Sequence, residues 1–356
     1  LRKNLVAGGL ALLAGTAAAT AATPAGLSSR LDVLRAAIGA NEDVTVRYTL
    51  HNGSTHDLLI VYWQTPLRGV FNDLFDVSRD GRPVAYTGRL EKWATPQAKD
   101  FLRIPAGGDL SAVVELSAVY DLSRSGEYTV RYRLHDVESP MVLGNAGGAE
   151  LLRAQDLGSN AVTLAVTRDE AAEAARALPP DFYESEAQGI DPTYVTPGYV
   201  SCSTSRQTTL KSALGAAETM ASKAKAYLAT GAHDSGYTTW LGTYTTSNYA
   251  TATAHFNSIY SVFNSKKVTF YCDCTDSSYA YVYPNQPYNI HLCSAFWSAP
   301  LTGTDSKGGT LVHECSHFTV VAGTDDWAYG QAGCKALSTA KKLDNADCHE
   351  YFAESK

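Results

Sequence analysis

A His-Glu-x-x-His segment near the end of the chain carries the residue types best suited to catalysis. It reads His313-Glu314-Cys315-Ser316-His317. Residues four apart on an α-helix lie one turn above each other, so the two imidazoles can bind one metal ion. Glu314 is not a ligand in this arrangement, but its carboxylate can reach a water molecule on the metal. Zinc lowers the pKa of that water to about 7, and the carboxylate accepts its proton as the oxygen attacks a carbonyl carbon. The spacing therefore predicts zinc-dependent hydrolysis.

The third metal ligand is less constrained by the residues alone. A catalytic zinc ion needs three protein ligands and one open position. A histidine six residues after His317 is excluded, because Gly323 occupies that place. Glu350 is one candidate, provided that a later helix folds back onto the first. The segment 323–330, Gly-Thr-Asp-Asp-Trp-Ala-Tyr-Gly, is the other, because Gly323 permits a sharp turn that brings a carboxylate back to the metal.

The residues around the motif indicate a buried helix in a mostly helical region. Apolar side chains flank the histidines, as a helix inside a core requires. Apolar residues also recur every three or four positions over 210–228 and over 249–263, which predicts two further helices. Short β-prone segments follow at 268–272, 279–283 and 289–292. We therefore expect a mostly helical α+β domain with a small sheet.

Between residues 41 and 166 the pattern changes to the period of two that is typical of half-buried strands. Alternating segments such as 44–50, 128–134 and 162–166 are separated by turn signals such as Ser125-Gly126. Short strands at these intervals predict an antiparallel sandwich of roughly seven strands, which we expect to be immunoglobulin-like. The residues of this all-β region offer no catalytic constellation.

The composition excludes one class of partner and indicates an oxidising environment. The net charge is −7, with 29 Lys and Arg against 36 Asp and Glu. This balance argues against nucleic-acid binding, which needs a cationic surface. All seven cysteines follow residue 200, so one half of the chain is built without disulfides. The other half is expected to be cross-linked for an extracellular environment.

Composition also divides the chain into four parts. The cations of Leu1-Arg2-Lys3 and the uncharged stretch after them are typical of a secretory signal peptide, with an apolar core too short to span a bilayer. Prolines between 179 and 197 predict an exposed connector that a protease can cut. The expected parts are a signal peptide over 1–22, a β-sandwich over 23–168, a proline-rich connector over 169–198 and a second domain over 199–356.

The helix motif and segment 323–330 together resemble a known family. His-Glu-x-x-His followed by Gly-Thr-x-Asp-x-x-Tyr-Gly is similar to the deuterolysin-type zinc endopeptidases, also called aspzincins. The resemblance implies a zincin-like metallopeptidase domain that binds one zinc ion through His313, His317 and Asp326. It also implies that Glu314 is the catalytic base and that the hydroxyl of Tyr329 donates to the oxyanion of the tetrahedral intermediate.

Further segments between about 199 and 356 are similar to the peptidyl-Lys metalloendopeptidase branch of this family. They include 280–285 (Ala-Tyr-Val-Tyr-Pro-Asn) and 345–352 (Asn-Ala-Asp-Cys-His-Glu-Tyr-Phe). That branch cuts on the amino side of lysine, and the resemblance implies that Asp347 and Glu350 hold the lysine ammonium group. Two carboxylates three residues apart lie on the same face of a helix, and such a pair prefers a compact cation.

The cysteine pairing follows in part from the same resemblance. The expected bridges are Cys202–Cys272, Cys274–Cys293 and Cys334–Cys348. The first two carry over from the family by position, whereas the cysteines of the third are additional to the family pattern. Cys315 is also additional, and we expect it to be a buried thiol on the catalytic helix.

These inferences combine into one leading hypothesis and two alternatives. We expect a monomeric, secreted, extracellular zinc endopeptidase, made as a zymogen, that hydrolyses Xaa-Lys bonds in proteins and peptides by Glu-assisted attack of zinc-bound water. The sandwich would be a pro-domain and an intramolecular inhibitor. Its two lysines, Lys92 and Lys99, are expected in one loop-like stretch, and one of them would occupy the lysine pocket as a pseudo-substrate. No nucleic-acid partner is expected, and no membrane contact after signal removal. The alternatives are a broad-specificity, deuterolysin-like peptidase and an extracellular binding protein with a degenerate peptidase domain.

Overall fold

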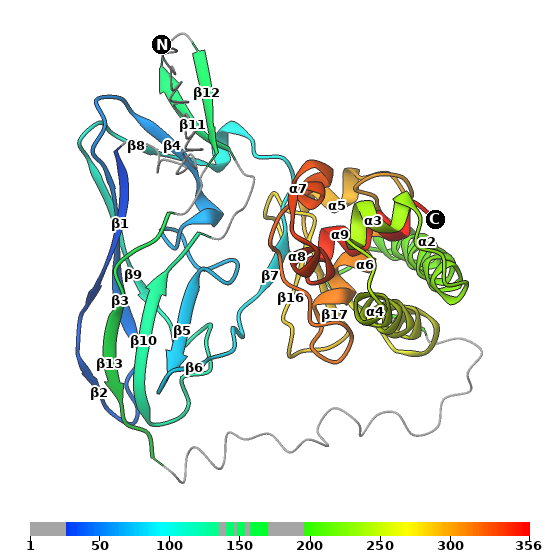
Figure 1. Ribbon diagram of the computed structural model, residues 1–356, viewed down its shortest axis with the longest axis horizontal. Helices are drawn as coiled ribbons and strands as arrows, with labels where there is room; N and C mark the ends of the chain where they lie inside the picture. Colours follow the sequence, from blue (N-terminus) through cyan, green and yellow to red (C-terminus); the bar gives the residue numbers. More distant parts are fainter. Residues whose placement is uncertain (1–25, 135–139, 146–147, 154–156, 170–195) are drawn as a thin grey trace, which may run out of the picture.

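The computed structural model describes residues 26–134, 140–145, 148–153, 157–169 and 196–356. Figure 1 shows a strand-rich part formed by the first half of the chain beside a helical part formed by the second half. The expected signal peptide and most of the expected connector lie outside the described residues. The prediction of a strand-rich region followed by a helical region with a sheet is confirmed.

The strand-rich part forms three sheets within the described residues. The first has the order β1 (Leu27–Val33), β3 (Thr45–Asn52), β9 (Asp109–Glu115). The second has the order β2 (Ala37–Ile38), β13 (Val162–Val166), β10 (Gly126–Tyr132), β5 (Phe75–Arg79), β6 (Arg82–Pro83). The third has the order β12 (Gly148–Arg153), β11 (Pro140–Asn145), β4 (Leu58–Val61), β8 (Phe101–Ile104). Two short 3₁₀ turns, η1 (Tyr62–Gln64) and η2 (Ala98–Asp100), lie between these strands in the chain.

Alternating side chains fill the core of this part, as the period of two predicts. Val46, Tyr48 and Leu50 of β3 are fully buried, and the ring of Tyr48 packs on Tyr132 at 4.7 Å. The strands exceed the roughly seven expected, and β2 pairs with β13 in parallel. Strands such as β1 escape sequence analysis because only two of its seven residues are buried. The immunoglobulin-like class of this region stays a prediction.

The helical part begins with two long helices at the positions that the apolar period predicts. They are α2 (Thr204–Ala229) and α4 (Thr246–Ser265). Each begins at a hydroxyl cap, since Ser203 accepts the backbone N–H of Arg206 and Thr245 accepts that of Asn248. The shorter helices are α3 (Ser235–Leu241), α5 (Ser294–Ser298), α7 (Gly330–Ala336), α8 (Thr339–Leu343) and α9 (Ala346–Glu354).

Helix α6 (Lys307–His317) carries the His-Glu-x-x-His motif through the centre of the helical part, and all eleven of its residues are buried. Ser306 caps it by accepting the backbone N–H of Gly309 at 2.9 Å. Gly308 lets α6 approach α2 closely, because a Cβ there would lie 3.0 Å from the Cβ of Ala216. The helix is therefore fixed from three sides, by its cap, by α2 and by α9, against which it also packs.

A sheet of the helical part receives one strand from the first half of the chain. Its order is β14 (Gly198–Val200), β15 (Thr269–Tyr271), β17 (Asn289–Leu292), β16 (Ala280–Val282), β7 (Leu90–Lys92). Strand β7 runs antiparallel to β16, with Lys92 opposite Ala280 and Glu91 opposite Tyr281. The sequence places Lys92 in a loop-like stretch, and this expectation is wrong, because pairing with β16 makes it a strand residue. Figure 1 shows β7 between the two parts.

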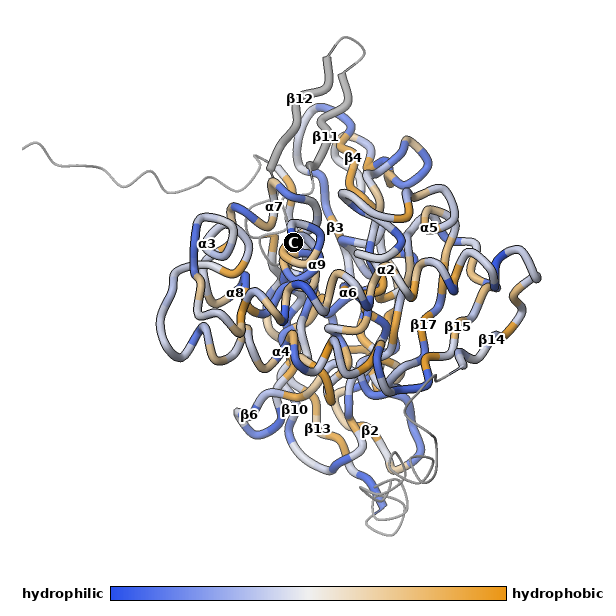
Figure 2. Tube along the Cα trace, turned by 90° about the vertical axis from the view of Figure 1, so that its right-hand side faces the viewer, coloured by the Kyte–Doolittle hydropathy of each residue, from blue (hydrophilic) through white to orange (hydrophobic). Residues whose placement is uncertain are grey.

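Buried apolar residues gather in one large cluster in each part and a smaller one where the parts meet. The smaller cluster contains Val61, Trp63 and Trp93, with Tyr329 of the helical part packed against it. Figure 2 shows short hydrophobic segments interrupted by hydrophilic ones along the helices and strands. Among the helices that the structure describes, none is long and apolar enough to cross a membrane.

Candidate active site

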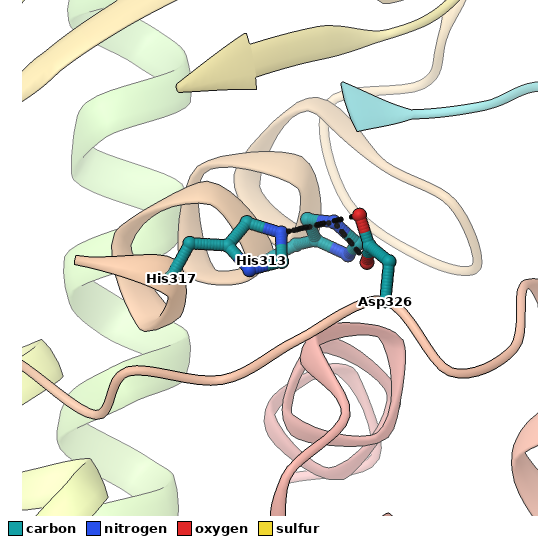
Figure 3. A group of neighbouring side chains, drawn as sticks. All are labelled: His313, His317 and Asp326. Atoms are coloured by element: carbon teal, nitrogen blue, oxygen red, sulfur yellow. Dashed lines mark hydrogen bonds and ion pairs between the residues drawn. The ribbon is translucent and has the colours of Figure 1, made fainter. Parts of the chain in front are cut away.

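The two histidines of α6 and Asp326 point their polar atoms at one another (Figure 3). The Nε2 atoms of His313 and His317 are 3.1 Å apart. Oδ1 of Asp326 lies 3.3 Å from Nε2 of His313, and Oδ2 lies 3.5 Å from Nε2 of His317. All three side chains are completely buried. The structure therefore brings together the three candidate ligands that the sequence predicts.

The turn after α6 returns Asp326 to the histidines. Gly323 has a φ of 61°, in the left-handed region that favours glycine, and its N–H donates to the carbonyl of Phe318. The N–H of Thr324 then donates to the carbonyl of Ser316, on the last turn of the helix. The carbonyl of Thr324 in turn accepts Nδ1–H of His317 at 2.8 Å, so Nε2 is the ring nitrogen that faces the other candidate ligands.

The geometry of this group fits a zinc ion. Tetrahedral bonds of about 2.0–2.1 Å place neighbouring ligand atoms about 3.3 Å apart. The three separations of 3.1, 3.3 and 3.5 Å agree with that value. Both carboxylate oxygens of Asp326 are buried without a hydrogen-bond donor, which is costly unless a cation binds there. Burial raises the pKa of Asp326, but attraction to the rings of His317 and His313 lowers it more. The pKa of this carboxyl is therefore below its usual range.

Glu314 lies beside this group with its carboxylate unpaired. The side chain is completely buried, and neither carboxylate oxygen has a hydrogen-bond partner. Burial raises the pKa of Glu314 well above its usual range, although the neighbouring His313 acts in the opposite direction. A buried carboxylate with a raised proton affinity is suited to accept a proton during a reaction.

Tyr329 reaches across to the strand-rich part. Its hydroxyl donates to the backbone carbonyl of Glu91 at 2.9 Å and accepts Nδ2–H of Asn72 at 2.8 Å. Sequence analysis does not find Asn72, because no pattern around it marks a contact with a residue more than two hundred positions later. The carbonyl of Glu91 belongs to the peptide bond that joins Glu91 to Lys92.

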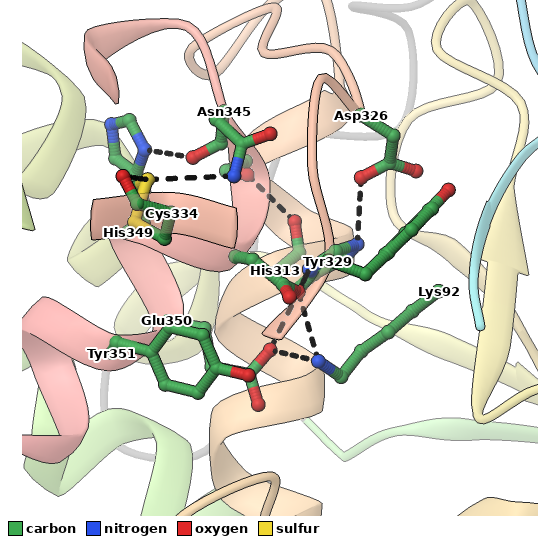
Figure 4. A network of polar contacts seen from close by, with 12 residues as sticks. Lys92, His313, Asp326, Tyr329, Cys334, Asn345, His349, Glu350 and Tyr351 are labelled. Carbon is green, nitrogen blue, oxygen red and sulfur yellow. Dashed lines mark hydrogen bonds and ion pairs between the residues drawn. A yellow bond between two sulfur atoms is a disulfide. The ribbon is translucent and has the colours of Figure 1, made fainter. Parts of the chain in front are cut away.

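Asp347 and Glu350 of α9 both contact the ammonium group of Lys92, and Figure 4 shows Lys92 extending towards Glu350. The Nζ atom lies 2.9 Å from Oδ1 of Asp347 and 2.8 Å from Oε2 of Glu350. All three side chains are at most 1% exposed. Burial alone would lower the pKa of Lys92, but the two carboxylates raise it above its usual value. A third carboxylate, Asp305, lies 3.4 Å from Nζ and accepts the hydroxyl hydrogen of Tyr351.

Glu350 does not lie on the ligand side of the histidines. Its Oε2 is 3.5 Å from Nδ1 of His313, the ring nitrogen that faces away from Asp326. Of the two candidates for the third ligand, Asp326 lies where the Nε2 atoms of both histidines meet, and Glu350 does not.

Asn345 holds the loop that carries Asp326 and Tyr329, and sequence analysis does not find it. Its Oδ1 accepts the backbone N–H groups of Trp327 and Ala328, at 2.8 and 3.0 Å. Its Nδ2 donates to the carbonyl of Ala328 at 3.1 Å. Asn345 stands two residues before Asp347. The start of α9 therefore fixes both the loop of Asp326 and Tyr329 and the carboxylate that contacts Lys92.

The cysteines of the helical part form three bridges. They are Cys202–Cys272, Cys274–Cys293 and Cys334–Cys348. The third joins α7 to α9 and therefore ties the chain after Tyr329 to the helix of the pocket. Cys315 is a free, buried thiol.

Together these features are typical of a metallopeptidase. The buried helix carries two histidines, a turn brings a carboxylate back to them, and a nearby edge strand pairs with an extended peptide segment. The family described as "Lysine-specific metallo-endopeptidase", the aspzincins, matches residues 226–354. An "Extracellular protease" of Aeromonas hydrophila is 39% identical over 352 residues, which are 97% of each chain. A "Peptidyl-Lys metalloendopeptidase" of Grifola frondosa is 33% identical over 96% of each chain. The chain belongs to the aspzincin family and is a metalloendopeptidase.

Two further relatives match less than half of this chain. A "Peptidyl-Lys metalloendopeptidase" of Pleurotus ostreatus is 52% identical over 165 residues, which are 44% of this chain and 96% of the relative. A solved zinc peptidase from Grifola frondosa is 45% identical, with a TM-score of 0.42, and covers 43% of this chain and 97% of that one.

Proposed function

We propose that this aspzincin is a secreted, extracellular zymogen of a zinc endopeptidase that cleaves on the amino side of lysine. Residues 1–22 would be the signal peptide, 23–168 the pro-domain, 169–198 the connector with the activation site, and 199–356 the peptidase domain. The active enzyme would act on proteins and peptides as a monomer. The resemblance to an extracellular protease over nearly the whole chain supports this organisation.

The observation that carries the proposal is the position of the Glu91–Lys92 peptide bond. Strand β7 pairs with β16 as an extended substrate pairs with the edge of a sheet. The lysine side chain lies between Asp347 and Glu350, while the carbonyl on its amino side accepts the hydroxyl hydrogen of Tyr329. A substrate bound in this way would present its Xaa-Lys bond to the candidate catalytic groups.

The chemistry follows from the same contacts. When bound to His313, His317 and Asp326, zinc would supply a Lewis acid and lower the pKa of a water molecule to about 7. Glu314 would accept a proton from the attacking water and deliver it to the departing amine of the lysine residue. Tyr329 would donate its hydroxyl hydrogen to the carbonyl oxygen as negative charge develops there.

Lysine selectivity would come from the fully buried carboxylates. Leaving a buried charge without its partner costs about 3–5 kcal/mol, so a residue without an ammonium group would bind the pocket poorly. This feature favours a lysine-selective enzyme over the broad-specificity alternative.

Inhibition by the pro-domain would follow because β7 is held on both sides of the Glu91–Lys92 bond. On one side, the guanidinium group of Arg89 lies over the ring of Phe71. On the other, Trp93 stacks on Trp63 with ring centroids 4.0 Å apart. The β7 segment would therefore stay paired with β16, with Lys92 between Asp347 and Glu350, until cleavage of the connector allows the pro-domain to dissociate.

Product termini test the lysine preference directly. The full chain is cut in the connector and incubated with a denatured protein, and the new N-termini are identified by mass spectrometry. We expect lysine at most of them, and none of these products with Glu314→Gln, the control for contaminating proteases. New N-termini without lysine enrichment would refute the specificity and favour the broad-specificity alternative.

A further inference from the structure

The carboxylate of Asp347 contacts both Lys92 and the candidate metal ligand His313. Its Oδ1 is 2.8 Å from Nδ1 of His313 and 2.9 Å from Nζ of Lys92. Its Oδ2 accepts the backbone N–H of Gly330 at 2.6 Å. One oxygen therefore contacts both a ring nitrogen and the ammonium group, and the other holds the backbone next to Tyr329.

We propose that Asp347 is a positioning residue of the metal centre as well as a wall of the lysine pocket. Through this carboxylate, the lysine of a substrate acts on His313, so that lysine recognition affects the catalytic step and not binding alone. The inference rests on the proposed function for the identity of the metal ligands and of the pocket.

The role of Asp347 follows from the two nitrogens of one ring. Nε2 of His313 faces Asp326 and His317, so it must offer a lone pair to a metal ion there. Nδ1 must then carry the proton, and Oδ1 of Asp347, 2.8 Å away, is the carboxylate oxygen that can hold this tautomer and the orientation of the ring. A carboxylate acceptor also makes the imidazole a stronger ligand.

The two histidines differ in a way that makes this role specific. Nδ1 of His317 donates to a backbone carbonyl, that of Thr324, whereas the ammonium group of Lys92 contacts Asp305, Asp347 and Glu350. Nδ1 of His313 lies 2.8 Å from a carboxylate oxygen that also contacts the ammonium group. When lysine occupies the pocket, its positive charge draws on the same Oδ1. The electron density that His313 offers to the metal therefore changes with substrate, whereas that of His317 does not.

The other pocket carboxylates provide the comparison. Oε2 of Glu350 contacts Nζ at 2.8 Å but is 3.5 Å from His313. Asp305 is 3.4 Å from Nζ, and its other contact is the hydroxyl of Tyr351. Asp305 thus contacts the lysine without contacting a candidate metal ligand. The structure offers it as the matched control for Asp347.

The first measurement is the zinc affinity of the full chain, determined by competition with a chromogenic chelator. Outer partners of metal-bound histidines are worth about 10–100-fold in affinity, and we expect a loss of this size for Asp347→Asn. We expect Asp305→Asn to bind zinc as the parent does. Equal zinc affinity in the parent and Asp347→Asn would overturn the proposal.

The second measurement separates kcat from KM after the connector is cut. The substrates are two peptides that differ only in lysine or norleucine after the scissile bond, since norleucine keeps the stem of the side chain and lacks the charge. We expect the parent to turn over the lysine peptide with the higher kcat. Asp347→Asn should lower kcat for both peptides and make the two kcat values equal. A change in KM for the lysine peptide, with kcat unchanged, would instead make Asp347 a pocket wall only and refute the inference.

A third variant covers the case in which Asp347→Asn does not fold. Asp347→Glu keeps the charge for the ammonium group but moves the carboxylate away from Nδ1 of His313. We expect weaker zinc binding with lysine preference retained, and parental zinc affinity would contradict the proposal. Zinc affinity does not depend on cleavage specificity. Digests without lysine enrichment would therefore refute the proposed function, while the zinc result judges the inference separately.

Discussion

Replacement of Lys92 by methionine tests the proposal that the pro-domain closes the active site. The methionine side chain has nearly the length of lysine without its charge, so Lys92→Met removes the ammonium group while β7 can still pair with β16. The change leaves Asp347 and Glu350 buried without a cation. Lys99 provides the matched control, because it is an exposed residue of the turn η2 in the same segment.

The size of the effect follows from the burial of this group. Breaking a buried ion pair costs about 3–5 kcal/mol, which corresponds to roughly 100- to 4,000-fold in affinity. Burial raises the pKa of Glu350, so this carboxyl can take up a proton and remove part of the penalty. We therefore expect the pro-domain to bind about 100-fold more weakly, at the lower end of that range.

The assay uses the full chain with its connector cut, so that the pro-domain is held by contacts alone. Activity on a lysine-containing peptide is followed as the protein is diluted, and the half-maximal concentration gives the affinity of the pro-domain. Lys92→Met should become active at about 100-fold higher protein concentration than the parent, and Lys99→Met at the parental concentration. Equal inhibition in the parent and Lys92→Met would refute the pseudo-substrate reasoning.

Three further predictions concern the catalytic groups and pH. Glu314→Gln should lower kcat by about 10²–10⁴-fold with zinc retained, because the proposed general base is lost. Metal analysis and single-turnover rates check this, and loss of zinc would contradict it. Tyr329→Phe should lower kcat by about 10²-fold or more with little change in KM, because the hydroxyl acts on the oxyanion; an effect on KM alone would contradict it. Burial raises the pKa of Glu91 to about 8, so the bound pro-domain keeps a proton that the released one loses. The affinity of the pro-domain for the peptidase domain should thus fall as pH rises from about 4.5 to 8, by at most about tenfold per pH unit. Glu91→Gln should abolish this pH dependence.

The candidate metal site is the feature that sequence analysis predicts best. The positions of His313 and His317 follow from helical spacing, and Gly323 marks the turn that returns Asp326. These are local constraints, since the residues concerned lie within fourteen positions of one another in the sequence. The long helices are predictable for the same reason, because their apolar period is a local property of the chain.

Contacts between the two halves of the chain are not predictable in this way. Strand β7 has three residues, and they are buried because β16 pairs with them and α9 surrounds Lys92. No local pattern distinguishes Lys92 from Lys99 before those partners are known. Asn72 and Asn345 are missed because a single amide carries no period, and their importance lies only in the groups they meet.

X-ray absorption at the zinc edge of the zinc-loaded full chain tests the central claim most directly. The claim is that one ion binds to His313, His317 and Asp326, and it predicts one zinc per chain with nitrogen and oxygen ligands only. Asp326→Ala, measured in parallel, should bind zinc much more weakly than the parent. A sulfur ligand at about 2.3 Å, which would implicate the buried Cys315, or parental zinc binding by Asp326→Ala would contradict the account.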